Sequence, residues 1–366
     1  MQKEYPMNEA VVPDRLAAWL AQALLGGASD LHLTPAYPPA LRLHGDLTEL
    51  KEPPLVGTEL DELLNAISPK DVIDRLRDHR DADFSFDPII EGKPARFRVH
   101  LFIVGGHFAA CFRIIPTTIP TFDWTGFPVT LAERLAFLRD GLVILTGPTG
   151  SGKTTTLALI VNLLNQTGGY RIITVEEPVE YQFPKALHSV VTQREVGTDV
   201  LSFADGLRAG LRQDPDVILV GEVRDRETAQ MALSAAETGH LVFTTLHTRD
   251  AKGAISRFAD LFPQDSQSTV RAQLAMSLRS VVSQRLLPGI HRGEKRHLAI
   301  EVLWNTHPIA SAIRTSKLES IDNYLMTNRE EGMISFDESV RRLLKAGKIT
   351  REIAERNVRE MAVLNR

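Results

Sequence analysis

A glycine-rich loop carries the clearest chemistry in this sequence. The octapeptide Gly147–Thr154 matches the pattern G-x-x-x-x-G-K-[ST] at every fixed position. In this pattern the glycines let backbone N–H groups surround phosphates, the lysine reaches the β- and γ-phosphates, and the last hydroxyl can bind Mg²⁺. We therefore predict a nucleotide site, against the alternative of a purely structural glycine turn. The predicted contact residues are Gly147, Pro148, Thr149, Gly150, Ser151, Gly152, Lys153, Thr154 and Thr155.

The segments on either side of this loop are those that a phosphate-binding loop requires. The apolar run Leu142–Thr146 precedes the loop and predicts a buried strand. Residues 155–166 predict a helix, whose positive N-terminal end would attract phosphate. Few chance matches to the pattern would lie between a strand and a helix, so the context supports nucleotide binding.

Two carboxylates follow predicted strands and are candidates for hydrolysis, which needs an acid to hold metal and orient water. Glu176 and Glu222 each come directly after, or one residue after, a short apolar run. Residues just beyond the carboxyl ends of strands face the ligand crevice of open α/β sheets. We predict that both act in catalysis and metal binding; which of them activates water stays open. Solvated loop acids are the alternative for both, and Glu177 and Glu180 are weaker candidates.

Two histidines bracket another predicted strand, 241–245. His240 and His247 would stand at its opposite ends, so we expect no metal ion shared between them. A polar role beside the nucleotide is predicted for His247, at the carboxyl end of the strand. The alternative for each is an ordinary core or loop histidine.

Arginines can neutralise the charge that builds during phosphoryl transfer, from the same chain or from a neighbour. Position alone singles out none of the candidates, each of which is otherwise a surface or structural charge. They are Arg96, Arg98, Arg113, Arg194, Arg208 and Arg212.

The pattern of apolar residues divides the chain into regions. Residues 1–115 predict a small α+β domain, and the proline- and threonine-rich segment 116–121 predicts a linker. Residues 122–290 contain four apolar runs separated by helical segments, which is typical of a parallel sheet with helices on both faces. From about residue 266 onward we expect mostly helix, with one strand near 298–303, and we place the end of the α/β core at 290.

Composition limits the class of protein. The 366 residues carry a net charge of −4, and the chain lacks a stripe of basic and aromatic residues, which disfavours a nucleic-acid partner. A single cysteine, Cys111, excludes disulfide frameworks and tetracysteine zinc sites. The sequence has no signal-peptide core and no apolar stretch of membrane-spanning length, so we expect a cytoplasmic protein.

Four motifs in fixed order give a family resemblance that covers roughly residues 15–360. The phosphate loop, residues 174–181 (TVEEPVEY), 214–225 (DPDVILVGEVRD) and 236–248 (AETGHLVFTTLHT) resemble the Walker A, Asp, Walker B and His boxes of the secretion ATPases of type IV pili and type II secretion. The resemblance implies a PAS-like N-terminal domain, a RecA-like ATPase core, a mostly helical C-terminal region over 291–366, and a homohexameric ring. It also implies that nucleotide lies between the two domains.

The resemblance assigns roles to particular residues. ATP and Mg²⁺ are the implied cofactors, with the metal held by Thr154, Glu176 and Glu222. Glu177 stands where the Asp box usually has aspartate. The implied catalytic residues, including the His-box pair and two strand arginines near the γ-phosphate, are Lys153, Glu176, Glu222, His240, His247, Arg98 and Arg113.

Within this superfamily the chain is most similar to the PilT-like retraction branch. It lacks a tetracysteine element, and residues 306–314 and 332–337 resemble the retraction ATPase tail, although Ala310 replaces one arginine of that motif. Residues 283–286 instead resemble the assembly and type II branch. The branch implies a motor for pilus retraction and twitching motility, acting on an inner-membrane platform protein to which it associates peripherally. A second pilus motor ATPase is a further implied partner.

Other functions remain as alternatives. A type II secretion or conjugation-type transport ATPase belongs to the same class. A non-hydrolysing nucleotide-binding subunit that regulates a pilus motor belongs to another. The presence of Lys153, Thr154, Glu176 and Glu222 argues against that last alternative, because a degenerate subunit usually loses some of these groups.

Overall fold

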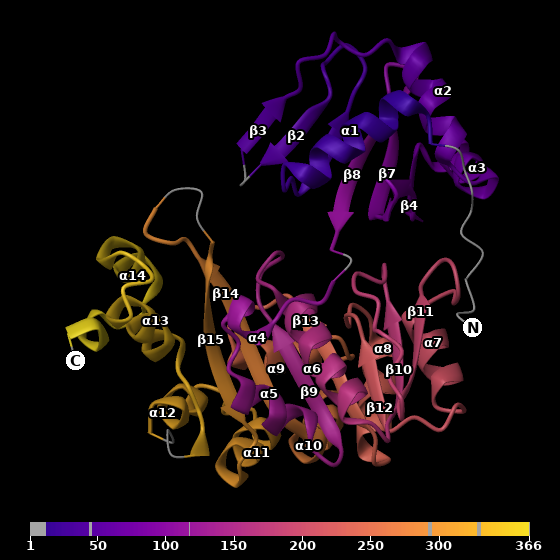
Figure 1. Ribbon diagram of the computed structural model, residues 1–366. Helices are drawn as coiled ribbons and strands as arrows, with labels where there is room; N and C mark the ends of the chain where they lie inside the picture. Colours follow the sequence, from indigo (N-terminus) through magenta and orange to yellow (C-terminus); the bar gives the residue numbers. More distant parts are fainter. Residues whose placement is uncertain (1–11, 44–45, 117, 292–294, 328–330, 366) are drawn as a thin grey trace. The chain divides into compact units, whose positions relative to one another are not determined.

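The computed structural model describes residues 12–43, 46–116, 118–291, 295–327 and 331–365. They form two compact units, one ending at Thr118 and one beginning at Ile119 (Figure 1). This boundary falls inside the segment predicted to be a linker, of which residue 117 lies outside the described part of the chain. Among the described helices, none combines the length and the apolar character that crossing a membrane requires.

The first unit is one antiparallel sheet with helices on one of its faces. Its six strands are in the order β3-β2-β1-β8-β7-β4. Leu31, Phe97 and Phe112 point to one face, where they are buried with residues of the helices such as Trp19 and Leu60. The elements are α1 (Asp14–Leu25), β1 (Asp30–Leu33), β2 (Ala40–Leu43), β3 (Asp46–Glu49), α2 (Gly57–Ile67), α3 (Lys70–His79), β4 (Asp81–Phe86), β5 (Ile89–Ile90), β6 (Lys93–Pro94), β7 (Arg96–Val104) and β8 (His107–Ile115).

The second unit contains a seven-stranded sheet in the order β11-β10-β12-β13-β9-β14-β15. Neighbouring strands run parallel except β14 and β15, which are antiparallel. Every residue of β9 and β13 is buried, because helices cover both faces of the sheet. Its elements up to β15 are α4 (Phe122–Thr125), α5 (Val129–Ala136), β9 (Gly141–Thr146), α6 (Lys153–Thr167), β10 (Arg171–Glu176), β11 (Val190–Glu195), α7 (Phe203–Gly210), β12 (Val217–Val220), α8 (Arg226–Glu237), β13 (Leu241–Leu246), α9 (Ala251–Asp260), α10 (Gln267–Ser277), β14 (Leu278–Leu287) and β15 (His297–Trp304).

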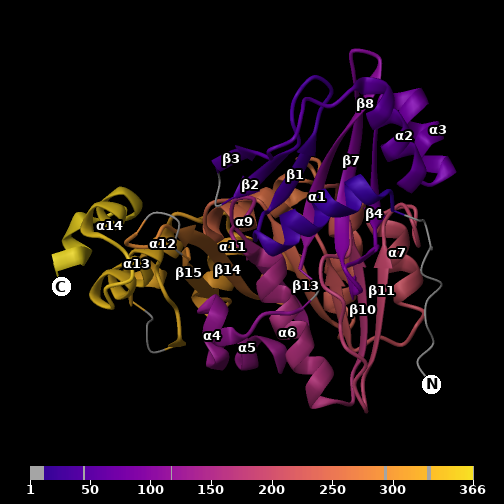
Figure 2. The same cartoon turned by 45° about the horizontal axis from the view of Figure 1, so that its top comes forward.

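The C-terminal segment packs against one edge of this sheet. Helices α12 to α14 gather beside β15, at the edge opposite β11, in both views (Figures 1 and 2). Phe336 and Val340 form a small apolar cluster with Leu287 of β14 and Ala299 of β15. The segment comprises α11 (His307–Arg314), α12 (Ser320–Thr327), α13 (Phe336–Lys345), α14 (Arg351–Asn357) and the 3₁₀ helix η2 (Met361–Asn365).

The predicted α/β class is confirmed, and the four apolar runs form the parallel strands β9, β10, β12 and β13. The expectation of mostly helix after residue 266 was wrong over β14. Leu278, Val281 and Val282 have helical spacing, but the strand also buries the polar Ser283 and Gln284. Since β15 extends the same sheet, the sheet continues past residue 290, where the end of the core was placed.

Candidate nucleotide site

The glycine-rich loop connects β9 to α6 at the carboxyl end of the sheet. Gly147 has φ 143°, and a side chain there would clash with the carbonyl oxygen of Gln284 in the neighbouring strand β14. Gly152 has φ 88° and precedes the first residue of α6. Both positions therefore require glycine. These two glycines let the loop turn back over the N-terminus of the helix.

Lys153 lies within this loop and is 8% exposed. Its ammonium group donates hydrogen bonds to the carbonyl oxygens of Gly147 at 2.9 Å and Pro148 at 3.2 Å. Burial lowers the pKa of Lys153, and the negative charges of Glu222 and Glu180 partly oppose that shift. A phosphate would supply the charged partner that the two neutral carbonyls do not provide.

The hydroxyl of Ser151 shows that the loop suits an anion. It is buried, and among the described residues it has no hydrogen-bond partner. Buried hydroxyls are normally paired, and this one lies in a loop at the positive end of a 15-residue helix. Loop, lysine and helix end therefore fit a polyphosphate bound between β9 and α6.

The threonines of the first turn of α6 have different surroundings. Thr154 is half-buried beside the loop, as a residue that helps to hold Mg²⁺ requires. The hydroxyl of Thr155 lies 3.0 Å from that of Tyr181, and Thr156 accepts a hydrogen bond from Gln284 at 2.9 Å. The hydroxyl of Thr155 thus joins α6 to the loop after β10, and its predicted contact with nucleotide stays a prediction.

Glu222 lies just beyond β12 and meets two cationic or polar groups. Its carboxylate is 3.1 Å from Nε2 of His247, at the end of β13, and 2.5 Å from the guanidinium of Arg224. Because β12 and β13 are parallel neighbours, their carboxyl ends bring Glu222 and His247 together. Glu222 is buried, and its charge reaches Lys153. The structure thus groups Lys153, Glu222 and His247, as predicted.

Two candidate carboxylates lie at the end of β10 and in the loop that follows it. Glu176 is buried at the end of the strand, where it accepts hydrogen bonds from Thr174 at 2.7 Å and Gln193 at 3.3 Å. The negative charge of Glu180, the weaker candidate, partly opposes the fall in the pKa of Lys153. The catalytic role of Glu176 stays a prediction.

The remaining predicted residues do not join this group. His240 lies at the amino end of β13, where its ring nitrogen Nδ1 is 3.0 Å from the carbonyl oxygen of Ala235. A strand of this length separates it from His247 by roughly 20 Å. Its predicted catalytic role has no support in these contacts.

Arg98 and Arg113 belong to the first unit. They are directly opposite each other on β7 and β8, on the sheet face away from its apolar core. Arg98 donates to Asp83 at 3.3 Å and Arg113 to Asp30 at 2.9 Å. Their role toward the γ-phosphate stays a prediction.

Protein side chains alone do not form a metal centre in the described part of the chain, where no group of three or more His, Cys, Asp or Glu could hold a metal ion. This agrees with the usual binding of Mg²⁺, which takes one or two protein ligands and completes its shell with phosphate oxygens and water. Thr154 and the nearby carboxylates are of the right chemistry for that arrangement.

Comparison with known proteins agrees with this geometry. A family profile described as "Type II/IV secretion system protein" matches residues 7–358. The chain belongs to this family. It is 40% identical over 343 residues to the type IV pilus retraction ATPase PilT of Pseudomonas aeruginosa, and the match covers 94% of this chain and 96% of that protein. It is 38% identical over 330 residues to the protein YggR of Escherichia coli, with 90% of this chain and 98% of YggR covered.

A solved structure gives the same result. The crystal structure of the pilus retraction motor PilT with bound ADP matches this chain with a TM-score of 0.85 at 42% identity, over 96% of this chain and 98% of that one. The chain is an ATPase of the PilT-like group, and its predicted resemblance to that group is confirmed.

Proposed function

We propose that this ATPase is a hexameric motor that powers type IV pilus retraction and thereby twitching motility. The observation that carries the proposal is the match to PilT, which extends over 96% of that protein's length. By contrast, the type II secretion protein E of Pectobacterium carotovorum is 47% identical, but only 29% of it is covered. A motor of the retraction type therefore accounts for the whole chain.

The chemistry that we propose follows from the residues around the glycine-rich loop. Lys153 and the loop N–H groups bind the β- and γ-phosphates, and Thr154 holds Mg²⁺ together with phosphate oxygens. Glu176 and Glu222, at the carboxyl ends of the neighbouring parallel strands β10 and β12, orient the attacking water and help to hold Mg²⁺. His247 holds the carboxylate of Glu222 through the 3.1 Å contact.

The mechanical output is the second part of the proposal. Six copies form a ring, Arg98 and Arg113 complete the nucleotide site of the same or a neighbouring copy, and hydrolysis closes and opens the domains in turn. The motion acts on an inner-membrane platform protein, at which the chain is peripherally bound on the cytoplasmic side. A second pilus motor ATPase works beside it; PilU of Pseudomonas aeruginosa is itself 36% identical to this chain.

Two other functions remain candidates. A type II secretion or conjugation-type transport ATPase is supported by the 47% identity over 158 residues to the type II secretion protein E. A non-hydrolysing regulatory subunit is disfavoured, because the chain keeps Lys153, Thr154, Glu176 and Glu222, some of which a degenerate subunit usually loses.

Deletion of the gene tests the proposal, with surface pili counted and twitching scored. Abundant pili without twitching are expected, and restoration by the wild-type gene but not by Lys153→Ala would tie the phenotype to ATP. Loss of pili would instead assign the motor to assembly, and unchanged pili would point to secretion or DNA transfer.

A further inference from the structure

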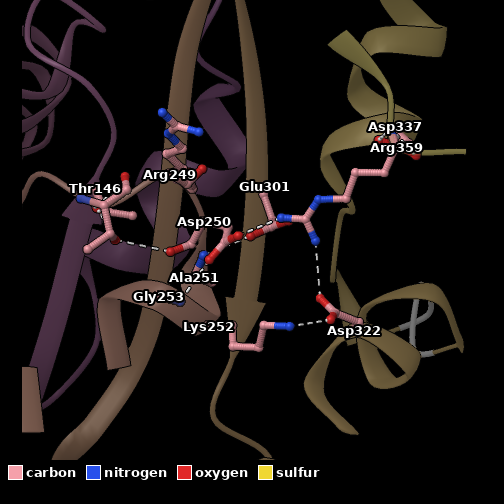
Figure 3. A network of polar contacts seen from close by, with 12 residues as sticks. Thr146, Arg249, Asp250, Ala251, Lys252, Gly253, Glu301, Asp322, Asp337 and Arg359 are labelled. Carbon is pink, nitrogen blue, oxygen red and sulfur yellow. Dashed lines mark hydrogen bonds and ion pairs between the residues drawn. The ribbon is translucent and has the colours of Figure 1, made fainter. Parts of the chain in front are cut away.

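Arg359, in the C-terminal segment, contacts the loop that carries His247. This residue follows α14, more than a hundred positions after the loop in sequence. Its guanidinium donates to Asp250 at 2.5 Å and to Asp322 of α12 at 3.3 Å (Figure 3). The contact with Asp250 joins the tail of the chain to the loop between β13 and α9.

Asp250 connects Arg359 to the start of α9. One of its oxygens caps α9 by accepting the N–H of Gly253 at 2.7 Å, while Arg359 binds the other. The next residue, Ala251, donates its N–H to the buried Glu301 of β15 at 2.8 Å. The start of α9 is thus held by two acids, one of which is itself bound by Arg359 (Figure 3).

From Asp250 the contacts lead to the nucleotide site. Thr248 donates its hydroxyl to the carbonyl of Asp250 at 3.2 Å, and its N–H bonds Thr146 at 2.9 Å. Thr146 is the last residue of β9 and directly precedes Gly147. His247, which precedes Thr248, meets Glu222 at 3.1 Å. A displacement of Asp250 would therefore be passed through Thr248 to His247.

The backbone at Arg359 is fixed by hydrogen bonds to helix α13. Its backbone N–H bonds both carboxylate oxygens of Asp337, at 3.0 and 3.1 Å, and the N–H of Glu360 bonds one of them at 2.9 Å. Asp337 belongs to α13, which packs on β14 and β15. Asp322, the second carboxylate that Arg359 contacts, also binds Lys252 of α9 at 2.6 Å.

We propose that Arg359 is a positioning residue for ATP hydrolysis: through Asp250 it sets the 247–250 loop so that His247 meets Glu222. The inference rests on the proposed role of His247 and goes beyond it, since it makes the C-terminal segment part of what determines the turnover rate. The proposed contacts to the phosphates come from Gly147–Thr154 and not from Arg359, so the effect falls on kcat and not on KM.

Steady-state ATPase assays on the full chain with Mg²⁺-ATP test this. Arg359→Ala is expected to lower kcat about tenfold, because small displacements of a catalytic group are costly. KM should stay within about twofold. Arg359→Lys retains the charge but loses the simultaneous contact with two carboxylates. Its kcat should lie between those of Arg359→Ala and the wild type. Arg356→Ala is the matched control, since Arg356 lies on α14 and pairs only with Glu352, at 2.6 Å, among the described ion pairs.

A double-mutant cycle separates this route from a general loss of structure. His247→Ala alone must lower kcat, which tests the proposed function of that residue. In that background Arg359→Ala should lower kcat by less than about twofold, since its target is gone. A full further tenfold loss would overturn the inference while leaving the role of His247 intact. An equal effect of Arg356→Ala, or a change in KM alone, would also overturn it.

Discussion

Buried polar groups are bonded differently in the glycine-rich loop and around Asp337 in the C-terminal segment. Ser151 is buried without a partner among the described residues, and Lys153 donates only to neutral carbonyls. Asp337 is equally buried but accepts three hydrogen bonds from the backbone of Arg359 and Glu360. The loop leaves hydrogen-bonding groups for a ligand, whereas Asp337 uses both of its oxygens to hold the backbone of the C-terminal segment. The contrast predicts how substitutions at each place divide between activity and stability.

The largest effect is expected at Lys153. Lys153→Ala removes the ammonium that phosphates need, and kcat/KM should fall by at least about 10²-fold. Stability should change little, because the hydrogen bonds of the ammonium group go to the neutral carbonyls of Gly147 and Pro148. ATPase assays and thermal melts check both, with the exposed Lys185→Ala as control. Strong destabilisation by Lys153→Ala would show that the loop lysine is structural and would remove the contrast.

Glu222→Gln sharpens the assignment of the carboxylates. The variant should bind ATP and lose at least about 10²-fold in kcat, since the amide cannot act as a base. Of the two remaining acids, Glu176→Gln should have the larger effect and Glu180→Gln the smaller, because Glu176 lies at the carboxyl end of β10, beside the strand that carries Glu222. Nucleotide binding and turnover measured on all three variants give the order. A larger loss for Glu180→Gln than for Glu176→Gln would contradict this assignment.

Asp337→Ala and Ser151→Ala compare the two regions directly. Asp337→Ala strands two backbone N–H groups and should cost about 1–3 kcal/mol of unfolding free energy. Ser151→Ala removes a hydroxyl without a partner, so stability should be unchanged or slightly higher while ATP affinity falls. Denaturant titration with and without nucleotide measures each quantity. Equal destabilisation by both variants would contradict the contrast.

The smallest effect concerns Glu301. Burial raises its pKa above the ordinary glutamate value, so the folded chain binds the proton more tightly than the unfolded chain. The stability this group gives is complete at low pH and is lost as pH rises through the raised pKa. Glu301→Gln keeps an acceptor for Ala251 and should raise Tm at pH 8, on the order of 2 °C. The gain should shrink as pH falls toward the ordinary glutamate pKa; a gain independent of pH would exclude the ionised carboxylate as its cause.

Local patterns predicted the parts of the site that local sequence determines. The glycine-rich loop, the strand before it and the ends of β12 and β13 all follow from spacing and periodicity. Arg359 could not be singled out in this way, because its surroundings depend on a contact with Asp250, far away in the chain. β14 was missed because its buried Gln284 bonds Thr156, a partner that makes a polar residue acceptable inside a strand.

The central claim is that ATP hydrolysis by this chain drives pilus retraction. Imaging of labelled pili on cells whose only copy carries Glu222→Gln tests it most directly. We expect that pili still extend, while retraction events become rare compared with cells carrying the wild-type gene. Retraction at the wild-type frequency, in a variant shown to have lost ATPase activity, would contradict it.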